Sequence, residues 1–222
     1  LLEVKIKADG QQEYVDFGTH KASDMSADEV KELLLKSGLW VSLVQRPYGI
    51  VADPSAEPKA IFISAFSTAP LAASPEFALK DEFDNVQAAV NALGKLAKGG
   101  VHVSLNIDNY SGSPFHKLEN VIPHIVSGKH PAGNVGVQIS HISPIMKGET
   151  VWTVSLLSLA AIGRLLNTGK LNLARKVAIT GPKAIDPAYV DALPGISMKD
   201  IAEFYDNSAN DMRFISGDVL TG

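Results

Sequence analysis

The order of apolar and polar positions along the chain predicts strands and helices in alternation. Residues 59–66 are almost continuously apolar and rich in β-branched and aromatic side chains, which is typical of a strand buried on both faces. A helix is predicted over residues 74–98, because its first residues, Ser-Pro-Glu, supply a cap, a first-turn proline and an acid. Residues 101–105 are again strand-like. Strand, long helix and strand form a crossover unit, so we expect an α/β fold with a Rossmann-like parallel sheet.

The same patterns continue through the rest of the first 175 residues. Ser26 and Glu29 have the spacing of a capping box at a helix start, and Gly38 is the left-handed residue expected just after the end of that helix. Other elements are predicted from apolar runs and from helical spacing. The further strands cover residues 120–126 and 151–154, and the further helices cover residues 134–141 and 158–166.

The two ends of the chain follow other patterns. Residues 2–7 alternate apolar and charged side chains, an Asp-Gly turn follows, and residues 13–17 can return beside them. Residues 1–20 are therefore expected to be a strand hairpin or a linker. After residue 175 the predicted order is strand, strand, helix and strand, which is typical of a β-grasp module. These elements cover residues 176–180, 185–192, 197–205 and 212–217.

Two units follow from these patterns. We expect a Rossmann-like α/β domain over residues 1–175 and a β-grasp module over residues 176–222. Leu1 is not a methionine and no signal peptide follows it, so we expect a piece of a longer chain.

Composition limits the classes of protein to which the chain can belong. The 222 residues are 45% hydrophobic and 20% charged, which is ordinary for a soluble globular protein. A net charge of −4 without a Lys/Arg cluster argues against nucleic-acid binding. No apolar run reaches the roughly 18–20 residues that cross a bilayer, so no membrane span is expected. The absence of cysteine excludes disulfides, thiolate metal sites and cysteine nucleophiles.

Motifs for catalysis and cofactor binding are largely missing from the sequence. The dinucleotide-binding, P-loop, nucleophile-elbow and zinc-protease patterns are absent, and Gly133 and Gly136 form only a G-x-x-G. The six histidines are scattered singly, so we expect no metal site. His102 and His124 lie in strand patterns, where a hydrogen-bonded core or edge position is the simpler explanation. The residues alone therefore fit a scaffold or a binding protein as well as an enzyme.

Residues 36–48 bring together side chains that can bind a ligand. A charged helix ends there in Ser-Gly, and a partly aromatic loop leads to the next strand. Trp40, Arg46 and Tyr48 can each stack on a planar ligand, and α/β proteins often bind ligands at such loops. The alternative is that Trp40 and Leu43 anchor the loop to the core, and the residue types favour this packing role.

Nine motifs occur in one order from about residue 28 to the end of the chain. They are residues 37–40 (SGLW), 46–47 (RP), 70–72 (PLA), 130–133 (HPAG), 150–152 (TVW), 161–163 (AIG), 168–171 (TGKL), 178–182 (AITGP) and 215–220 (ISGDVL). Together they resemble the A subunit of the bacterial Na⁺-translocating NADH:quinone oxidoreductase. The resemblance implies a fragment that lacks the N-terminal barrel-like part and the C-terminal tail of that subunit. It also implies that the β-grasp segment is the family's soluble-ligand-binding module.

That family is similar in fold to the flavin- and NADH-binding subunit of respiratory complex I and to the C subunit of the Rnf complex. Those relatives carry a glycine-rich flavin loop after the helix that ends in Ser-Gly. Here residues 39–49 hold Trp-Val-Ser-Leu in place of those glycines. The replacement matters because only a backbone without side chains can approach a phosphate closely. Their acidic run after the next strand corresponds here to Phe-Ser-Thr-Ala-Pro at residues 66–70. We therefore expect the chain to bind neither FMN nor NADH.

The resemblance implies a cofactor-free, peripheral subunit on the cytoplasmic face of the bacterial inner membrane. Its partners would be the other subunits of a sodium pump that uses NADH, flavins, an iron–sulfur centre and quinone. The complex is an enzyme, whereas this fragment alone is expected to have no catalytic residues. Candidates for binding a quinone, or for an interface, are Trp40, Arg46, Tyr48, His130 and Gly133.

Two alternatives to this function remain open from the sequence. The chain can be a purely structural subunit, whose β-grasp face binds a neighbouring protein and which has no small-molecule site. An independent soluble flavin enzyme is disfavoured, because the glycine loop is missing.

Overall fold

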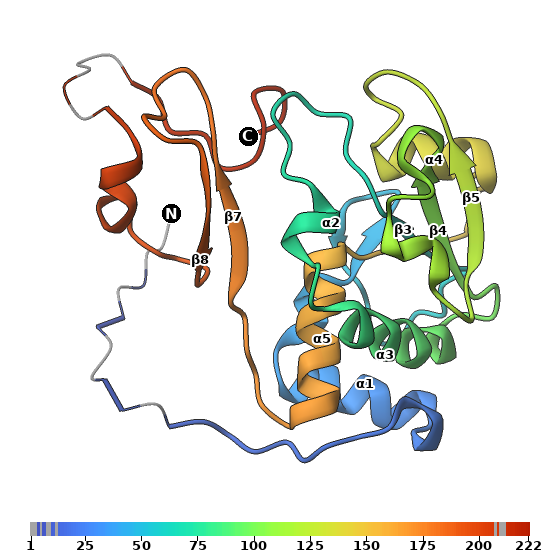
Figure 1. The fold of residues 1–222 in the computed structure, drawn as a ribbon. Coiled ribbons are helices and arrows are strands. Elements are labelled where there is room, and N and C mark those ends of the chain that lie inside the picture. The colour runs from blue at the N-terminus through green and yellow to red at the C-terminus, as the bar shows by residue number, and fades with distance from the viewer. Residues whose placement is uncertain (1–3, 5, 8–9, 12, 207, 209–211) are drawn as a thin grey trace.

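The computed structural model describes residues 4, 6–7, 10–11, 13–206, 208 and 212–222 (Figure 1). A six-stranded sheet lies at its centre, with the strand order β2-β1-β6-β3-β4-β5. The strands of this sheet are β1 (Val44–Arg46), β2 (Ile50–Val51), β3 (Ile61–Ser64), β4 (Val101–Asn106), β5 (Ile122–Val126) and β6 (Val151–Thr153). The α-helices of the described residues are α1 (Ala27–Lys36), α2 (Pro75–Ala78), α3 (Phe83–Leu93), α4 (Val135–Ile142) and α5 (Leu156–Thr168).

Four neighbouring strands of this sheet run parallel. β3 pairs in parallel with β4 on one side and with β6 on the other, and β4 pairs in parallel with β5. Because α3 lies between β3 and β4 in the chain, these elements form the predicted crossover unit. The predicted α/β fold is confirmed, and the sheet is mixed because β1 and β2 are added in antiparallel order beside β6.

The strand order reverses between β3 and β6. From β3 the chain builds β4 and β5 on one side, whereas β6 lies on the opposite side of β3. Such a reversal leaves a crevice outside the carboxyl ends of the strands, and ligands of α/β proteins bind there.

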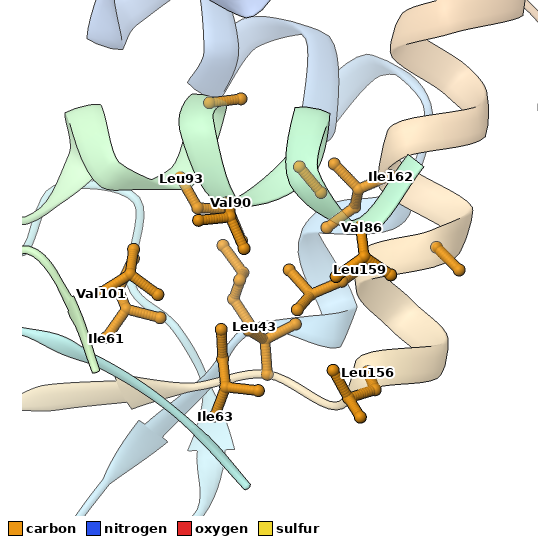
Figure 2. Packing of buried hydrophobic residues seen from close by; sticks show 14 of the residues in the cluster. Leu43, Ile61, Ile63, Val86, Val90, Leu93, Val101, Leu156, Leu159 and Ile162 are labelled. Carbon is orange, nitrogen blue, oxygen red and sulfur yellow. The ribbon is translucent and has the colours of Figure 1, made fainter. Parts of the chain in front are cut away.

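Two hydrophobic cores cover the two faces of the sheet. The larger core packs the sheet against α1, α3 and α5, and Figure 2 shows side chains of β3, α3 and α5 meeting in it. The smaller core joins Phe62 to Ile139 of α4 and to Val151. Since side chains alternate along a strand, Ile61 and Ile63 enter the larger core and Phe62 enters the smaller one. The predicted burial of this strand on both faces is confirmed.

The helix start predicted at Ser26 has the predicted geometry. The Ser26 N–H donates to Glu29 Oε2 at 2.6 Å, and the Glu29 N–H donates to Ser26 Oγ at 3.2 Å. The bonds that the Ser26 N–H and the Ser26 hydroxyl donate to Glu29 Oε2 lower the pKa of the Glu29 carboxyl, and the charge of this carboxylate favours the helix start. Gly38 follows the helix with φ +77°, as predicted.

The prediction of one long helix over residues 74–98 is wrong in one respect. The structure has two helices in this stretch. α2 ends at Ala78 and α3 begins at Phe83. Between them Leu79 leaves helical geometry and is buried in the larger core, while Glu82 forms an ion pair with Arg164 of α5. These long-range contacts accompany the break, and local sequence spacing does not show them.

The N-terminal segment does not form the predicted hairpin among the residues that the structure describes. Residues 13–17 are in no strand, and part of residues 2–7 lies outside the described residues. Instead, the Phe17 N–H donates to Gly169 O and the His20 N–H donates to Leu166 O, so this segment is fixed to the end of α5. The linker alternative for residues 1–20 stays a prediction.

The C-terminal part of the chain contains a separate antiparallel sheet of two strands, β7 (Arg175–Ile179) and β8 (Ala188–Ala192). The helical segment capped by Ser197 covers Met198–Phe204 and consists of two 3₁₀ turns joined by a kink at Ile201. Tyr189 of β8 attaches this sheet to α2, because its hydroxyl accepts from the Ser74 N–H at 2.8 Å and its ring lies 4.5 Å from that of Phe77.

The closing strand predicted over residues 212–217 does not form. These residues are described, and no strand includes them. Phe214 packs its ring on Tyr205 at 4.7 Å, and Asp218 accepts from the N–H groups of Leu220 and Thr221, which turns the chain. Of the predicted β-grasp elements, the structure therefore shows two strands and the helix. No helix of the described residues is long and apolar enough to cross a membrane.

Candidate ligand cavity at the strand ends

A cavity of about 670 Å³ opens where β3 and β6 end and where α4 and α5 begin. We call it the strand-end cavity. It lies at the reversal of strand order between β3 and β6, which is the expected place for a ligand in this fold. It is lined by Val41, Ser42, Val44, Arg46, Ser64, Gly133, Asn134, Val135, Gly136, Thr153, Val154, Ser155, Ser158 and Thr221.

Arg46 is the only charged residue among the described residues that line this cavity. Its backbone is fixed in β1, opposite Val151 of β6, and the residue is half-buried. Its guanidinium lies against the first turn of α4, since a Cβ built on Gly136 would stand 2.6 Å from Nη2. Among the residues that the structure describes, none forms a hydrogen bond or ion pair with the Arg46 side chain.

The end of β3 is tied to the turn before α4. Ser64 Oγ donates toward Phe66 O and Gly133 O, at 2.9 and 3.0 Å, and accepts from Gln138 Nε2 at 2.9 Å. Gln138 is only 3% exposed, and its amide Oε1 has no hydrogen-bond partner in the described part of the chain. These contacts fix the wall between β3 and α4.

Gly133 is a glycine because two backbone segments approach closely there. Its N–H donates to Thr68 Oγ1 at 3.0 Å, and a Cβ at this position would lie 2.6 Å from the Thr68 nitrogen. Any larger residue would separate the turn before α4 from the segment after β3. Gly133 therefore shapes the cavity without offering a side chain to a ligand.

The two helices that start at the cavity differ in how their first N–H groups are satisfied. At α5, Ser155 Oγ accepts from the Ser158 N–H at 3.1 Å and caps the helix. At α4, the side chain of Asn134 makes no capping bond. The first N–H groups of this helix, on Val135 and Gly136, have no acceptor within the described residues.

Two of the five predicted site residues, Arg46 and Gly133, meet in this cavity. Trp40 lies elsewhere, at 3% exposure inside the larger core. Its indole Nε1 donates to Ala52 O at 2.7 Å, and its ring packs edge-on against Trp152 with centroids 5.4 Å apart. This placement matches the alternative in which Trp40 anchors the loop.

Tyr48 and His130 do not line the cavity. Tyr48 is 79% exposed on the turn between β1 and β2. His130 is exposed, and its Nδ1 lies 3.3 Å from Thr68 Oγ1, next to the contact that Gly133 makes with the same threonine. Both side chains are accessible from solvent, but the structure does not bring them together with Arg46.

Sequence patterns missed the polar residues at the strand and helix ends. Ser64 and Thr153 close two parallel strands, and Asn134 and Ser155 precede two helices. Polar residues at the carboxyl ends of parallel strands meet at one edge of the sheet, so these residues could have been predicted to lie together. That prediction required the knowledge that β6 lies beside β3.

A pair of histidines on the face of the sheet was also missed. His102 Nδ1 and His124 Nε2 are 2.8 Å apart and share a hydrogen bond, and the His102 ring stacks on Phe62 with centroids 4.6 Å apart. Burial lowers the pKa of both imidazoles, and the charge of His124 lowers that of His102 further. Both were expected to be hydrogen-bonded strand histidines, but not with each other. The described residues contain no group of three or more metal-ligating side chains.

Comparison with known proteins gives one family model, described as the NqrA second alpha/beta domain, which matches residues 25–171. The A subunits of Na(+)-translocating NADH-quinone reductases are similar over the whole chain. That of Pseudomonas aeruginosa is 35% identical, that of Alcanivorax borkumensis 34%, and that of Haemophilus influenzae 32%. The chain covers 49%, 50% and 50% of these relatives, so it spans about half of their length.

Among solved structures, a chain of an NAD⁺-reducing NiFe hydrogenase in the H₂-reduced state is similar with a TM-score of 0.52 and 10% identity. The match covers 83% of this chain and 42% of that one. The air-oxidized state of such an enzyme gives the same TM-score at 13% identity, with 83% of this chain and 39% of that chain covered. At these identities the likeness concerns the fold alone.

Proposed function

Because this chain belongs to the NqrA family, we propose that it is part of the A subunit of a Na⁺-translocating NADH-quinone reductase. In that complex it is peripheral, on the cytoplasmic face of the bacterial inner membrane, beside the other subunits. It contributes to quinone binding and to assembly, while the complex as a whole uses NADH, flavins and an iron–sulfur centre. The chain itself carries no catalytic residue.

The observation that carries the quinone proposal is the composition of the strand-end cavity. A quinone headgroup is flat and apolar on its faces, and its two carbonyl oxygens accept hydrogen bonds. Four valines, at positions 41, 44, 135 and 154, supply apolar walls, and the unpaired guanidinium of Arg46 supplies a donor. Gly133 shapes the wall, whereas Trp40 holds the loop from the core side.

The packing of residues 39–49 supports a subunit without bound flavin or NADH. The 3₁₀ helix over Leu39–Ser42 directs Leu39 and Trp40 into the larger core, and Leu43 follows them. A glycine loop at this place would leave its N–H groups open to a phosphate, but here bulky side chains fix the segment. Flavin absorbance that co-purifies with the full-length protein at near-stoichiometric level would contradict this part of the proposal.

Photo-crosslinking with a quinone analogue tests the quinone site in the whole complex. We expect label in peptides containing residues 41–46, 133–136 or 153–158. We expect Arg46→Gln to reduce it, because a neutral amide on a shorter side chain replaces the charged guanidinium donor. Arg175→Gln is the matched control, since Arg175 is exposed on β7 and does not line the cavity. Label confined to other regions, including Tyr48 and His130, would move the quinone site away from this cavity.

A purely structural subunit is the second candidate function, and the exposed face near β8 favours it. Ile185 and Leu193 flank this strand with exposed fractions of 68% and 61%, so two large apolar side chains are available there to a neighbouring protein. Calorimetry of the full-length protein with a soluble quinone separates the two candidates. Saturable heat supports the quinone site, and its absence supports the structural role.

A further inference from the structure

We propose that the strand-end cavity contains a subsite for one oxyanion of the phosphate class, held by the Arg46 guanidinium and the first N–H groups of α4. This inference goes beyond the quinone proposal and rests on the electrostatics of the cavity. A quinone carbonyl and the oxyanion would use the same guanidinium, so the two ligands compete for it.

The first observation is the missing counter-charge of Arg46. A half-buried guanidinium has lost part of its hydration, and proteins usually compensate this loss with a carboxylate or with carbonyl oxygens. Among the described residues, Arg46 has neither. A guanidinium is planar and presents paired donors, which suits it to bind two oxygens of a phosphate together.

The second observation is the position of this cation on α4. The N-terminus of a helix carries a partial positive charge, so a cation there is unfavourable. Gly136 nevertheless leaves room for the Arg46 guanidinium against the first turn, as the 2.6 Å separation of a built Cβ from Nη2 shows. Asn134 does not cap the helix, and the Val135 and Gly136 N–H groups are unpaired in the described structure. An oxyanion between them would satisfy the guanidinium and the N–H groups at once.

The third observation is the absence of acids from the cavity wall. None of the described residues that line it is an aspartate or glutamate. Asp218 is close in sequence to the lining residue Thr221, but its carboxylate already accepts from the Thr221 hydroxyl at 2.7 Å and from the Leu220 N–H at 2.8 Å. The start of α5, with Ser155 and Ser158, brings a second positive helix end to the same cavity. The described lining of the cavity therefore contains one cation and no carboxylate.

Binding of inorganic phosphate to the full-length protein tests the proposal. Calorimetric titration at constant ionic strength, with chloride as the competing salt, is expected to show one saturable site. Arg46→Gln should lower the affinity for phosphate about tenfold or more, because a charge-assisted, bidentate contact is lost. Arg46→Lys should retain part of the affinity, since the charge stays and the fork geometry is lost. Arg175→Gln should bind phosphate like the unchanged protein.

Gly136→Ala provides a test that leaves all charges in place. The added methyl group would displace the guanidinium from α4, while alanine favours the helix, so weaker phosphate binding with unchanged thermal unfolding is expected. Absence of saturable phosphate binding would overturn the proposal. Wild-type affinity in Arg46→Gln would overturn it as well.

Two further comparisons separate the sources of the phosphate and the two proposals. FMN that binds and is displaced by phosphate would support the subsite and contradict the flavin-free subunit. Phosphate binding that is lost in Arg46→Gln, with quinone labelling unchanged, would support the subsite and contradict the role of Arg46 toward quinone. Quinone labelling that needs Arg46, without phosphate binding, would overturn the subsite and leave the quinone proposal intact.

Discussion

At the scale of single residues, Gly163 shows how closely two helices approach. This glycine lies on α5, and a Cβ built on it would stand 1.8 Å from the Asn85 carbonyl oxygen of α3. The nearest atoms belong to backbone, so a neighbouring rotamer change cannot relieve the contact. The close approach of α3 and α5 therefore depends on the missing side chain.

Gly163→Ala is expected to destabilise the protein by about 3 kcal/mol, because the added methyl group forces the helices apart. Chemical denaturation measures the change in the free energy of unfolding. Gly94→Ala is the control, since a Cβ there meets only Val101 at an ordinary 3.9 Å and the backbone is helical. Equal stability of the two variants would show that the helices can separate without cost.

Trp40 and Tyr48 differ in burial, although both are candidates for stacking on a planar ligand. Trp40→Ala is expected to cost about 3–5 kcal/mol, because a large buried ring and its hydrogen bond to Ala52 O are removed. Tyr48→Ala should change the free energy of unfolding by less than about 0.5 kcal/mol, as expected for an exposed residue. Urea denaturation of both variants measures this contrast, and similar values for the two would contradict the burial of Trp40.

The His102–His124 pair makes stability depend on pH. The pKa of both imidazoles is lower in the folded protein than the ordinary value of 6.5, so the unfolded chain binds more protons as the pH falls. The stability that the neutral pair contributes is therefore present above pH 6.5 and is lost as the pH falls toward the lower folded-state pKa.

This dependence is measured from the free energy of unfolding between pH 8 and pH 5.5, endpoints that bracket the ordinary histidine pKa of about 6.5. His124→Gln should flatten the decline, because one titrating group is removed and the other loses its charged neighbour. His141→Gln serves as the control, since His141 is exposed on α4. An unchanged slope in His124→Gln would assign the decline to other groups.

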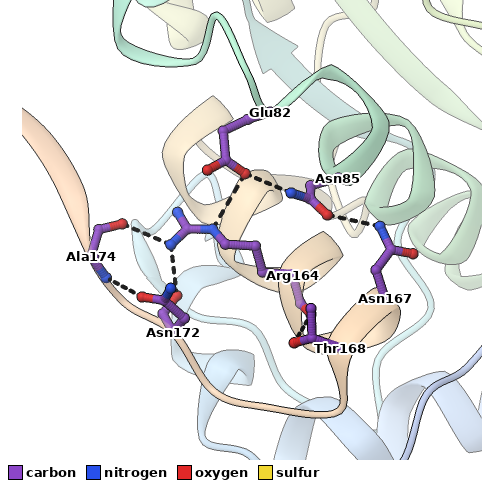
Figure 3. Close-up of polar contacts among 7 residues, drawn as sticks. All are labelled: Glu82, Asn85, Arg164, Asn167, Thr168, Asn172 and Ala174. Carbon is purple, nitrogen blue, oxygen red and sulfur yellow. Dashed lines mark hydrogen bonds and ion pairs between the residues drawn. The ribbon is translucent and has the colours of Figure 1, made fainter.

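At the scale of elements, Arg164 connects three parts of the chain (Figure 3). Its side chain is 13% exposed, and its Nε forms an ion pair with Glu82 at 3.4 Å, at the start of α3. Its Nη1 donates to the carbonyls of Asn172 and Ala174, at 3.1 and 2.9 Å, just before β7. α5 thereby fixes both the break between α2 and α3 and the path into the C-terminal sheet.

Arg164→Ala is expected to cost about 2 kcal/mol, because a largely buried carboxylate and two carbonyls lose a charged partner. Hydrogen exchange should also quicken in residues 172–179. Lys98→Ala is the matched control, since the Lys98–Glu57 pair is fully exposed and solvent screens it. Unchanged exchange in Arg164→Ala would show that the segment before β7 is fixed by other contacts.

At the scale of the whole molecule, the core of the six-stranded sheet is independent of the C-terminal sheet. No residue after Leu166 belongs to either hydrophobic core of the described sheet. This supports the proposed domain boundary near residue 175, with α5 as the last element of the first domain.

A chain that ends at residue 175 is therefore expected to keep cooperative unfolding, because it retains α5 and all core side chains. A chain that ends at residue 154 should be unfolded, since it lacks Leu159, Ile162 and Leu165 of the larger core. Circular dichroism with urea denaturation distinguishes the two. Loss of structure in the longer chain would show that the C-terminal sheet is needed for folding of the first domain.

The sequence by itself determined the elements whose causes are local. The capping box of Ser26 and Glu29, the glycine after α1 and the doubly buried strand β3 follow from spacing within a few residues, so their prediction needs no partner. The nine motifs likewise indicated the family, which the family model then showed. One local prediction, the strand over residues 212–217, was wrong, because no described strand pairs with this segment.

Only the tertiary structure decided what depends on contacts between distant segments. Trp40 is a core residue because Ala52 and Trp152 meet it, and Arg46 lines a cavity because β6 places it beside the start of α4. Spacing along the chain contains neither distance nor register, so the sequence could name Arg46 and Gly133 but could not bring them together. The sheet register does so, because the antiparallel pairing of β1 with β6 sets Arg46 opposite Val151, which belongs to the same small core as Ile139 of α4.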